Sequence, residues 1–197
     1  MREVTGTTRD FLMQIATKGK AKLQPQWHTP DEYLDAAREL MGGIDIDPAT
    51  DEKAQLRIKA KVYYTKETNG LDKPWMGRLW LGTPYAEGVL EQFMERAIEQ
   101  YQIGNVTEGL ILTHTNNTHH AYFQKTLRAC SALCLVNDYI RWVKGHEFEE
   151  QSAQALGISW IPEYTKHGNV VFYLGPKVEE FKRIFCKFGV CLCQMKS

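Results

Sequence analysis

The chain has 197 residues and a formal net charge of zero, with 24 basic and 24 acidic side chains. This length suits one domain with a single sizeable core, and the neutral balance argues against a protein covered with basic surface, although it leaves room for a local basic patch. No apolar run approaches the ~20 residues needed to span a bilayer, and no apolar signal segment is visible. We therefore expect a cytoplasmic protein.

The five cysteines are odd in number, so they cannot all pair in disulfides. Cys130 and Cys134, four residues apart, are expected to be small buried side chains. Cys186, Cys191 and Cys193 contain no C-x-x-C pair, and we predict no metal site there.

Strand and helix patterns alternate along residues 27–197, which we predict to form one domain after an N-terminal extension of residues 1–26. We expect helices from Thr29-Pro30 to Gly42-Gly43, at 87–102, at 121–132 and, at the end of the chain, through Val178 and Phe185, with a polar helix or loop from Asp51. Strands are expected at 44–46, 62–65, 79–81, 109–113, 133–136, 139–143 and 169–174. The alternation predicts an α/β fold with a largely parallel sheet and helices on both faces.

Two segments are candidates for contacts with a polymer. Arg57, Lys59 and Lys61 alternate and would share one face of a strand, which suits a phosphate patch as well as an ordinary solvated surface. Residues 144–168 form a long segment without a regular pattern, and loops of this length tend to be functional. Arg141 lies just before it.

The strand at 79–81 stops at Gly82-Thr83-Pro84-Tyr85. Proline stiffens this turn, and ligands of open α/β sheets bind outside the carboxyl ends of the strands. The corner suits a flat, ring-shaped substrate; a stiff turn with a packed tyrosine is the alternative. His114, His119 and His120 follow the strand at 109–113, but without a neighbouring carboxylate we predict no metal there.

Several motifs occur in one order: Trp27-x-Thr-Pro30, Ile44-Asp-Ile-Asp-Pro-Ala49, Tyr63-Tyr-Thr65, Gly70-Leu71, Trp75, Trp80-x-x-Thr-Pro-Tyr85, and the stretch from Leu112 to Phe123. In this order and spacing the chain resembles the phage-type DNA adenine N6-methyltransferases over about residues 27–175. The resemblance implies a Rossmann-like methyltransferase fold, S-adenosylmethionine as cofactor, DNA as partner, and a bacterial or phage-infected cell as its setting.

The resemblance also implies roles for particular residues. The cofactor site would contain Trp27, Thr29, Pro30, Asp45, Asp47 and Pro48, with Asp47 the better motif match because Asp45 can face the other side of its strand. A flipped-out adenine would be held by Thr83, Pro84 and Tyr85, with Tyr85 stacking on the base. Asn116, Asn117, Thr118 and Arg141 are expected to line the base pocket or to contact DNA.

Gly82 departs from the family's pattern, which has Asp or Asn at this position and Pro where this chain has Thr83. The family's side chain accepts a hydrogen bond from the adenine amine, and glycine lacks such a group. Three interpretations follow: Thr83 or a loop residue substitutes, the protein binds DNA or cofactor without efficient turnover, or it methylates a different acceptor.

Overall fold

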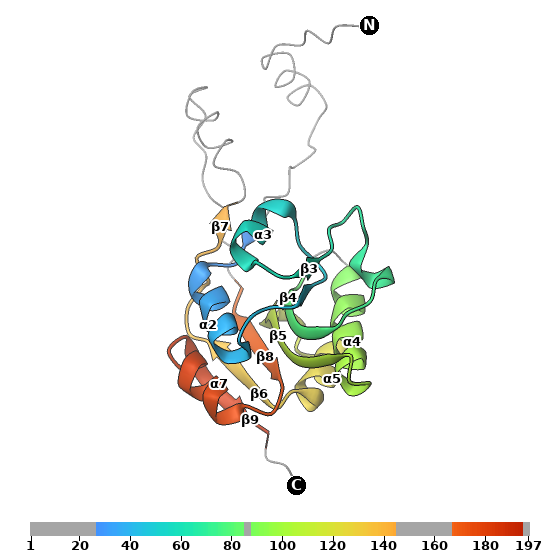
Figure 1. Ribbon diagram of the computed structural model, residues 1–197. Coiled ribbons are helices and arrows are strands. Elements are labelled where there is room, and N and C mark those ends of the chain that lie inside the picture. Colours follow the sequence, from blue (N-terminus) through green and yellow to red (C-terminus); the bar gives the residue numbers. More distant parts are fainter. Residues whose placement is uncertain (1–26, 85–87, 145–166, 195–197) are drawn as a thin grey trace, which may run out of the picture.

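The structure is a computed structural model that describes residues 27–84, 88–144 and 167–194 (Figure 1). Its centre is a seven-stranded sheet in the order β3-β2-β4-β5-β8-β6-β9. The strands are β2 (Ile46–Asp47), β3 (Val62–Tyr63), β4 (Gly77–Gly82), β5 (Val106–His114), β6 (Ala132–Val136), β8 (Asn169–Leu174) and β9 (Gly189–Cys193). A separate two-stranded pair joins β1 (Trp27–His28) to β7 (Val143–Lys144).

Helices cover both faces of the sheet, as predicted. On one face lie α2 (Asp31–Met41) and α7 (Val178–Phe185), and on the other lie α4 (Val89–Gln102) and α5 (Ala121–Ala129) (Figure 1). Alternation along β4 divides the core, since Trp80 packs with the α2 cluster and its neighbours Leu79 and Leu81 with the α4 cluster. The shorter α3 (Glu52–Ile58) follows β2, and two 3₁₀ turns cover Gly70–Asp72 and Thr115–Asn117.

Our prediction of a largely parallel sheet is wrong for half of the strand pairs in the seven-stranded sheet. Strands β3, β2, β4 and β5 pair in parallel, whereas the pairs β5–β8, β8–β6 and β6–β9 are antiparallel. β8 begins with Asn169 beside His114, at the carboxyl end of β5, so it has to run back along β5. The sequence pattern also did not predict β9, which forms an edge of the sheet.

Local signals placed most helix ends correctly. Gly42 ends α2 in the left-handed conformation with φ 74°, which glycine adopts without a steric penalty. Asp51 caps α3 by accepting hydrogen bonds from the backbone N–H groups of Lys53 and Ala54. At α2 the N-cap residue is Pro30, and no side chain caps this helix end.

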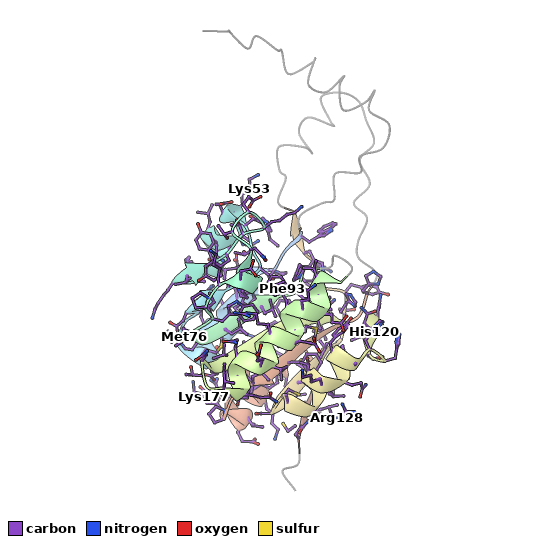
Figure 2. All side chains as sticks on the ribbon, turned by 90° about the vertical axis from the view of Figure 1, so that its right-hand side faces the viewer. Lys53, Met76, Phe93, His120, Arg128 and Lys177 are labelled. Atoms are coloured by element: carbon purple, nitrogen blue, oxygen red, sulfur yellow. The ribbon has the colours of Figure 1, made fainter. Side chains whose placement is uncertain are left out.

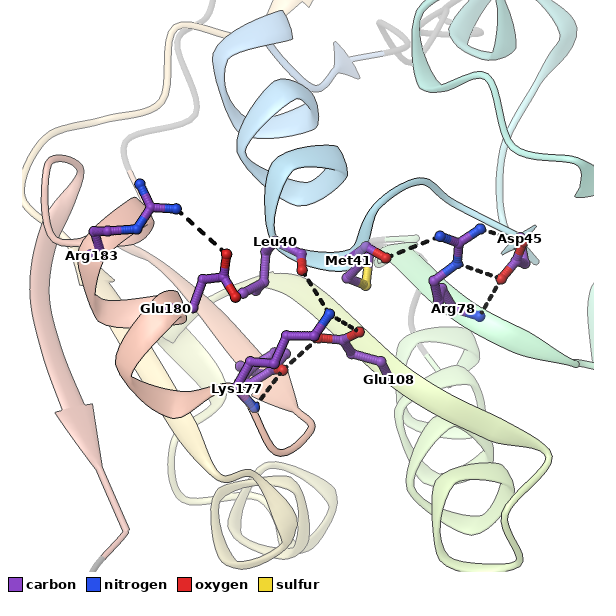
Figure 3. A network of polar contacts seen from close by, with 9 residues as sticks. Leu40, Met41, Asp45, Arg78, Glu108, Lys177, Glu180 and Arg183 are labelled. Atoms are coloured by element: carbon purple, nitrogen blue, oxygen red, sulfur yellow. Dashed lines mark hydrogen bonds and ion pairs between the residues drawn. The ribbon is translucent and has the colours of Figure 1, made fainter.

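A polar network ties α2 and α7 to the amino ends of β4 and β5 (Figure 3). The buried Glu108 carboxylate accepts hydrogen bonds from the Tyr173 hydroxyl at 2.5 Å and from Lys177 Nζ at 3.0 Å. Lys177 Nζ also donates to the carbonyl of Leu40 at 2.9 Å. Burial and the hydrogen bond to Glu108 raise the pKa of Tyr173 above its ordinary value, so the phenol keeps its proton.

Candidate active site

The carboxyl ends of β2, β4 and β5 meet at one edge of the sheet. These strands are parallel neighbours, so their last residues Asp47, Gly82 and His114 lie at the same edge. In this arrangement the segments after the strands, which include Pro48, Thr83 and the turn Thr115–Asn117, surround a common region. Open α/β sheets bind their ligands at such an edge.

The segment Trp27 to Pro30 is held beside α3, the helix that follows β2. Strand β1 pairs with β7, and His28 Nε2 lies 2.9 Å from Asp51 Oδ2 at the start of α3. His28 and Thr29 are both buried. The tertiary structure therefore brings the Trp-x-Thr-Pro motif close to the Asp-Pro motif, with which it is predicted to share a cofactor site.

Asp47 is a buried carboxylate at the end of β2. Its Oδ2 accepts a hydrogen bond from Gln55 Nε2 at 2.8 Å, and its Oδ1 accepts one from the backbone N–H of Ala49 at 3.2 Å. The residue as a whole is 1% exposed. Burial raises the pKa of Asp47 to about 7, because the ionised form loses its hydration, although these hydrogen bonds lower it in part. A cationic ligand would favour the ionised form of this group.

The raised pKa of Asp47 predicts a pH-dependent stability. The folded protein keeps the proton up to about pH 7, whereas the unfolded chain releases it near its ordinary value of 3.8, so the contribution of Asp47 to the unfolding free energy falls between these pH values. The difference in unfolding free energy between the Asp47→Asn variant and the wild type should shift in favour of the variant by about 2–4 kcal/mol from pH 4 to pH 8. Urea unfolding at several pH values measures it.

The control for this experiment is Asp35→Asn, which changes an exposed carboxylate on α2. This variant should follow the wild type in parallel across the same pH range. A difference for Asp47→Asn that stays constant between pH 4 and pH 8 would contradict the buried, proton-holding state of Asp47.

Asp45, predicted with Asp47 as a cofactor residue, is used differently in the structure. Its carboxylate binds Arg78 through Nε at 2.6 Å and Nη2 at 2.8 Å (Figure 3). It also pairs with Lys61 Nζ at 2.8 Å. The hydrogen bond from Arg78 holds the pKa of Asp45 well below its usual range. Asp45 thus joins the chain before β2 to the amino end of β4, away from Asp47, and we do not retain it in the candidate site.

Thr83 and Pro84 follow β4 directly, while Tyr85 lies outside the described residues. The Thr83 hydroxyl is turned inward: it lies 3.2 Å from the Leu112 carbonyl and 3.0 Å from Thr113 Oγ1, and Thr83 is 5% exposed. These contacts link the ends of β4 and β5. The side chain of Thr83 is therefore occupied by the neighbouring strand and is poorly placed to substitute for a missing group at residue 82.

Gly82 itself adjoins the Trp-x-Thr-Pro segment. A Cβ atom at this position would lie 3.8 Å from Thr29 Oγ1 and 3.8 Å from Trp80 Nε1, both ordinary contact distances, and the backbone φ lies outside the left-handed region. The position accepts a side chain without strain, and such a side chain would begin between two polar atoms.

The predicted substrate residues on the turn after β5 lie at the same edge of the sheet. Asn116 Nδ2 is 2.8 Å from His167 Nδ1, and Asn117 Nδ2 donates to the Tyr122 hydroxyl at 2.7 Å. Thr118 is exposed, as is Arg141, which lies two residues before β7. The strand that follows Arg141, β7, pairs with β1, which carries the Trp-x-Thr-Pro motif.

The other basic residues do not form the predicted strand face. Arg57 lies in α3 and pairs with Asp31 at 2.8 Å, Lys59 ends that helix with φ 56°, and Lys61 pairs with Asp45. Sequence reasoning also missed His28 and Gln55, which hold Asp51 and Asp47. His28 occupies the variable position of its motif, and Gln55 stands in a polar helix, so neither had a signal of its own.

The cysteines and histidines show no metal-binding arrangement in the described residues. No group of three or more His, Cys, Asp or Glu side chains there is placed to hold a metal ion. Cys130 and Cys134 are buried, as predicted, and burial raises the pKa of their thiols to about 12 and about 11. Across 27–84, 88–144 and 167–194, no helix has the length and apolarity to cross a membrane.

Comparison with known proteins is consistent with the motifs brought together at this edge. No curated protein matches the chain. The model of the family described as DNA N-6-adenine-methyltransferase (Dam) matches residues 16–165, which contain Thr29, Asp47 and the Gly82-Thr83-Pro84-Tyr85 corner. The match spans more than half of the chain, and the chain therefore belongs to the DNA N-6-adenine-methyltransferase family.

Proposed function

We propose that the protein transfers a methyl group from S-adenosylmethionine to N6 of adenine in DNA at specific sites, in a single Rossmann-like methyltransferase domain over residues 27–197. The observation that carries the proposal is the meeting of the Thr29, Asp47 and Gly82 motifs at one sheet edge, in a chain of the adenine methyltransferase family. We also propose that the protein acts in the cytoplasm of a bacterial or phage-infected cell.

The residues at this edge fit the cofactor. The ionised Asp47 carboxylate has lone pairs left beyond its two hydrogen bonds, and burial makes it a strong partner for an ammonium group or hydroxyls. Trp27, Thr29, Pro30 and Pro48 would complete the cofactor site around it. Bound there, S-adenosylmethionine supplies an electrophilic methyl group on a positively charged sulfur.

The corner after β4 would hold the target base. Adenine has to leave the duplex, since its reacting atom lies inside the stack. The Thr83 carbonyl, which precedes Pro84, would accept one hydrogen of the exocyclic amine, and Tyr85 would stack on the ring, worth ~1–3 kcal/mol per base in single-strand binders. The amine lone pair forms the new N–C bond while the C–S bond breaks with its electron pair on sulfur, and the amine releases one proton.

Contacts to DNA are assigned to Asn116, Asn117, Thr118 and Arg141. We expect Arg141→Ala to weaken binding of an unmodified DNA duplex about fivefold to tenfold and to reduce the slope of log affinity against log salt by about 1, because one phosphate contact is lost. Fluorescence anisotropy at several salt concentrations measures both quantities.

The matched control is Arg128→Ala, an exposed arginine at the far end of α5 from His120 (Figure 2). It should leave both the affinity and the salt slope unchanged. Equal effects of the two substitutions would mean that Arg141 contributes only general charge.

A second function, a methyltransferase-fold protein that binds DNA or cofactor without efficient turnover, is favoured by one observation. Residue 82 carries no side chain, and the Thr83 hydroxyl is engaged with β5. If nothing else accepts the amine hydrogen, the lost contact costs ~10²–10³ in rate.

Calorimetric titration with S-adenosylmethionine, followed by methyl transfer to unmodified DNA, tests the proposal. Binding and formation of N6-methyladenine, detected by mass spectrometry after nuclease digestion, are expected. Binding without transfer would favour the second function, and transfer to another base would indicate a different acceptor. Absence of binding would contradict the cofactor site at Thr29 and Asp47.

A further inference from the structure

The place left by the missing side chain at residue 82 is bordered by two polar groups. Side chains two residues apart on a strand point to the same face, so residue 82 would project on the side of Trp80, which packs with the α2 cluster. Thr29 stands just before α2 and lies at the same place. Both residues are more than nine-tenths buried, with exposures of 7% for Thr29 and 1% for Trp80.

The Thr29 hydroxyl comes close to where an amide oxygen of residue 82 would act. An asparagine oxygen lies about 2.4 Å from its Cβ, as the bond lengths of the side chain require. Thr29 Oγ1 lies 3.8 Å from the Cβ position of residue 82. The hydroxyl oxygen thus lies about 1.4 Å farther from this Cβ position than an amide oxygen of residue 82 would.

The two atoms differ in hydrogen-bonding character. The Thr29 hydroxyl has two acceptor lone pairs, whereas the Trp80 indole N–H only donates. Within the described residues, neither group takes part in a hydrogen bond. A buried acceptor beside a buried donor matches a ligand edge with an amine N–H next to an unprotonated ring nitrogen, and adenine and cytosine both have such an edge.

We propose that Thr29 replaces the missing side chain of residue 82 as the acceptor of the exocyclic amine, and that the Trp80 indole donates to the adjacent ring nitrogen. This inference rests on the proposed function and changes the role of Thr29 from cofactor binding to substrate recognition. The pair rejects guanine and thymine, whose corresponding edges present a carbonyl and a ring N–H and would oppose both groups. In the transfer step, Thr29 would orient the amine lone pair toward the methyl carbon. The N–C bond forms as the C–S bond breaks with its electrons on sulfur, and the amine proton passes to solvent water.

Substitutions at Thr29 separate substrate recognition from cofactor binding. Thr29→Val removes the hydroxyl at nearly constant volume, and we expect kcat to fall about 10- to 100-fold while the Kd for S-adenosylmethionine changes less than threefold. Thr29→Ser should keep most of the activity. In the Thr29→Val background, Gly82→Asn should restore kcat to at least the wild-type value, because it supplies an acceptor from the other side.

A binding measurement tests the inference apart from turnover. The protein saturated with S-adenosylhomocysteine is titrated with 2′-deoxyadenosine or 2′-deoxyinosine, and the Trp80 indole N–H is followed by ¹⁵N NMR, its resonance assigned with Trp80→Phe. Deoxyadenosine should shift this resonance, deoxyinosine should not, and Thr29→Val should weaken the deoxyadenosine titration at least fivefold.

The outcomes distinguish the two proposals. Loss of S-adenosylmethionine binding in Thr29→Val without rescue by Gly82→Asn would overturn the inference and return Thr29 to the cofactor site. An unmoved Trp80 resonance with deoxyadenosine would also overturn it. Failure of the wild type to bind S-adenosylmethionine or S-adenosylhomocysteine would instead refute the proposed function on which the inference rests.

Discussion

Replacement of Gly82 by asparagine should raise the rate of adenine methylation at least tenfold and up to about 10²-fold, because its amide oxygen adds a preorganised acceptor for the reacting amine to the Thr29 hydroxyl. The structure permits this gain. The backbone at Gly82 is outside the left-handed region, and a Cβ would make only ordinary contacts at 3.8 Å. The measurement is kcat for transfer of a labelled methyl group to unmodified DNA.

Gly82→Ala is the matched control, since it adds the Cβ without the amide. We expect this variant to keep the wild-type rate within about threefold, because alanine supplies neither an acceptor nor a clash. If Gly82→Asn and Gly82→Ala behave alike, the amide adds nothing to the acceptor that the protein already has, and the predicted gain would be refuted. A fall in rate for Gly82→Asn alone would mean that its side chain blocks the base.

Replacement of Glu108 by leucine should lower the unfolding free energy by about 2–4 kcal/mol, because the buried Tyr173 hydroxyl loses its acceptor and the ion pair with the half-exposed Lys177 is lost. The substitution leaves the Tyr173 hydroxyl, on a residue with 0% exposure, without its acceptor. It also removes the carboxylate that holds Lys177 against the carbonyl of Leu40, so α2 and α7 lose their polar connection to β5. Urea unfolding followed by circular dichroism measures the change.

Two further variants identify the cause of this loss. Glu179→Gln alters an exposed i,i+3 pair with Lys182 on α7 and should change stability by less than about 0.5 kcal/mol. Adding Tyr173→Phe to Glu108→Leu should cost less than the sum of the single changes, because the two side chains share one hydrogen bond. Strict additivity would show that Glu108 and Tyr173 are not coupled.

The polar network around Glu108 lies at the opposite ends of the strands from the candidate active site, so its effect on stability is expected to be independent of activity. Glu108 and Lys177 lie at the amino ends of the strands, whereas Asp47 and Gly82 lie at the carboxyl ends. A substitution of Lys177 that lowers stability only mildly should therefore leave the affinity for S-adenosylmethionine unchanged, at a temperature where the protein stays folded. The same parallel strands carry a stabilising edge and a candidate active edge.

The sequence alone determined the existence and type of most elements. The periodicity of residues 87–102 and 169–174 and the stop at Gly42 are local signals, and the structure has α4, β8 and the end of α2 at these places. The motif order was also sufficient to identify the family that the match over residues 16–165 establishes. These features depend on patterns between residues that are close in the sequence, so they can be recognised from the sequence alone.

Only the tertiary structure decided strand direction and the partners of the site residues. Whether β8 runs parallel or antiparallel depends on the edge at which the chain enters the sheet, and no pattern within residues 169–174 records that. Asp45 and Asp47 belong to one short motif, yet the structure gives them different surroundings. Arg78 binds the carboxylate of Asp45, whereas burial raises the pKa of Asp47. Likewise, Thr29 and Gly82 are 53 positions apart, and their proximity arises only because α2 packs on the face of β4 that carries Trp80. Charge pairing, burial and long-range proximity depend on distances in three dimensions, and the linear order of residues does not determine these distances.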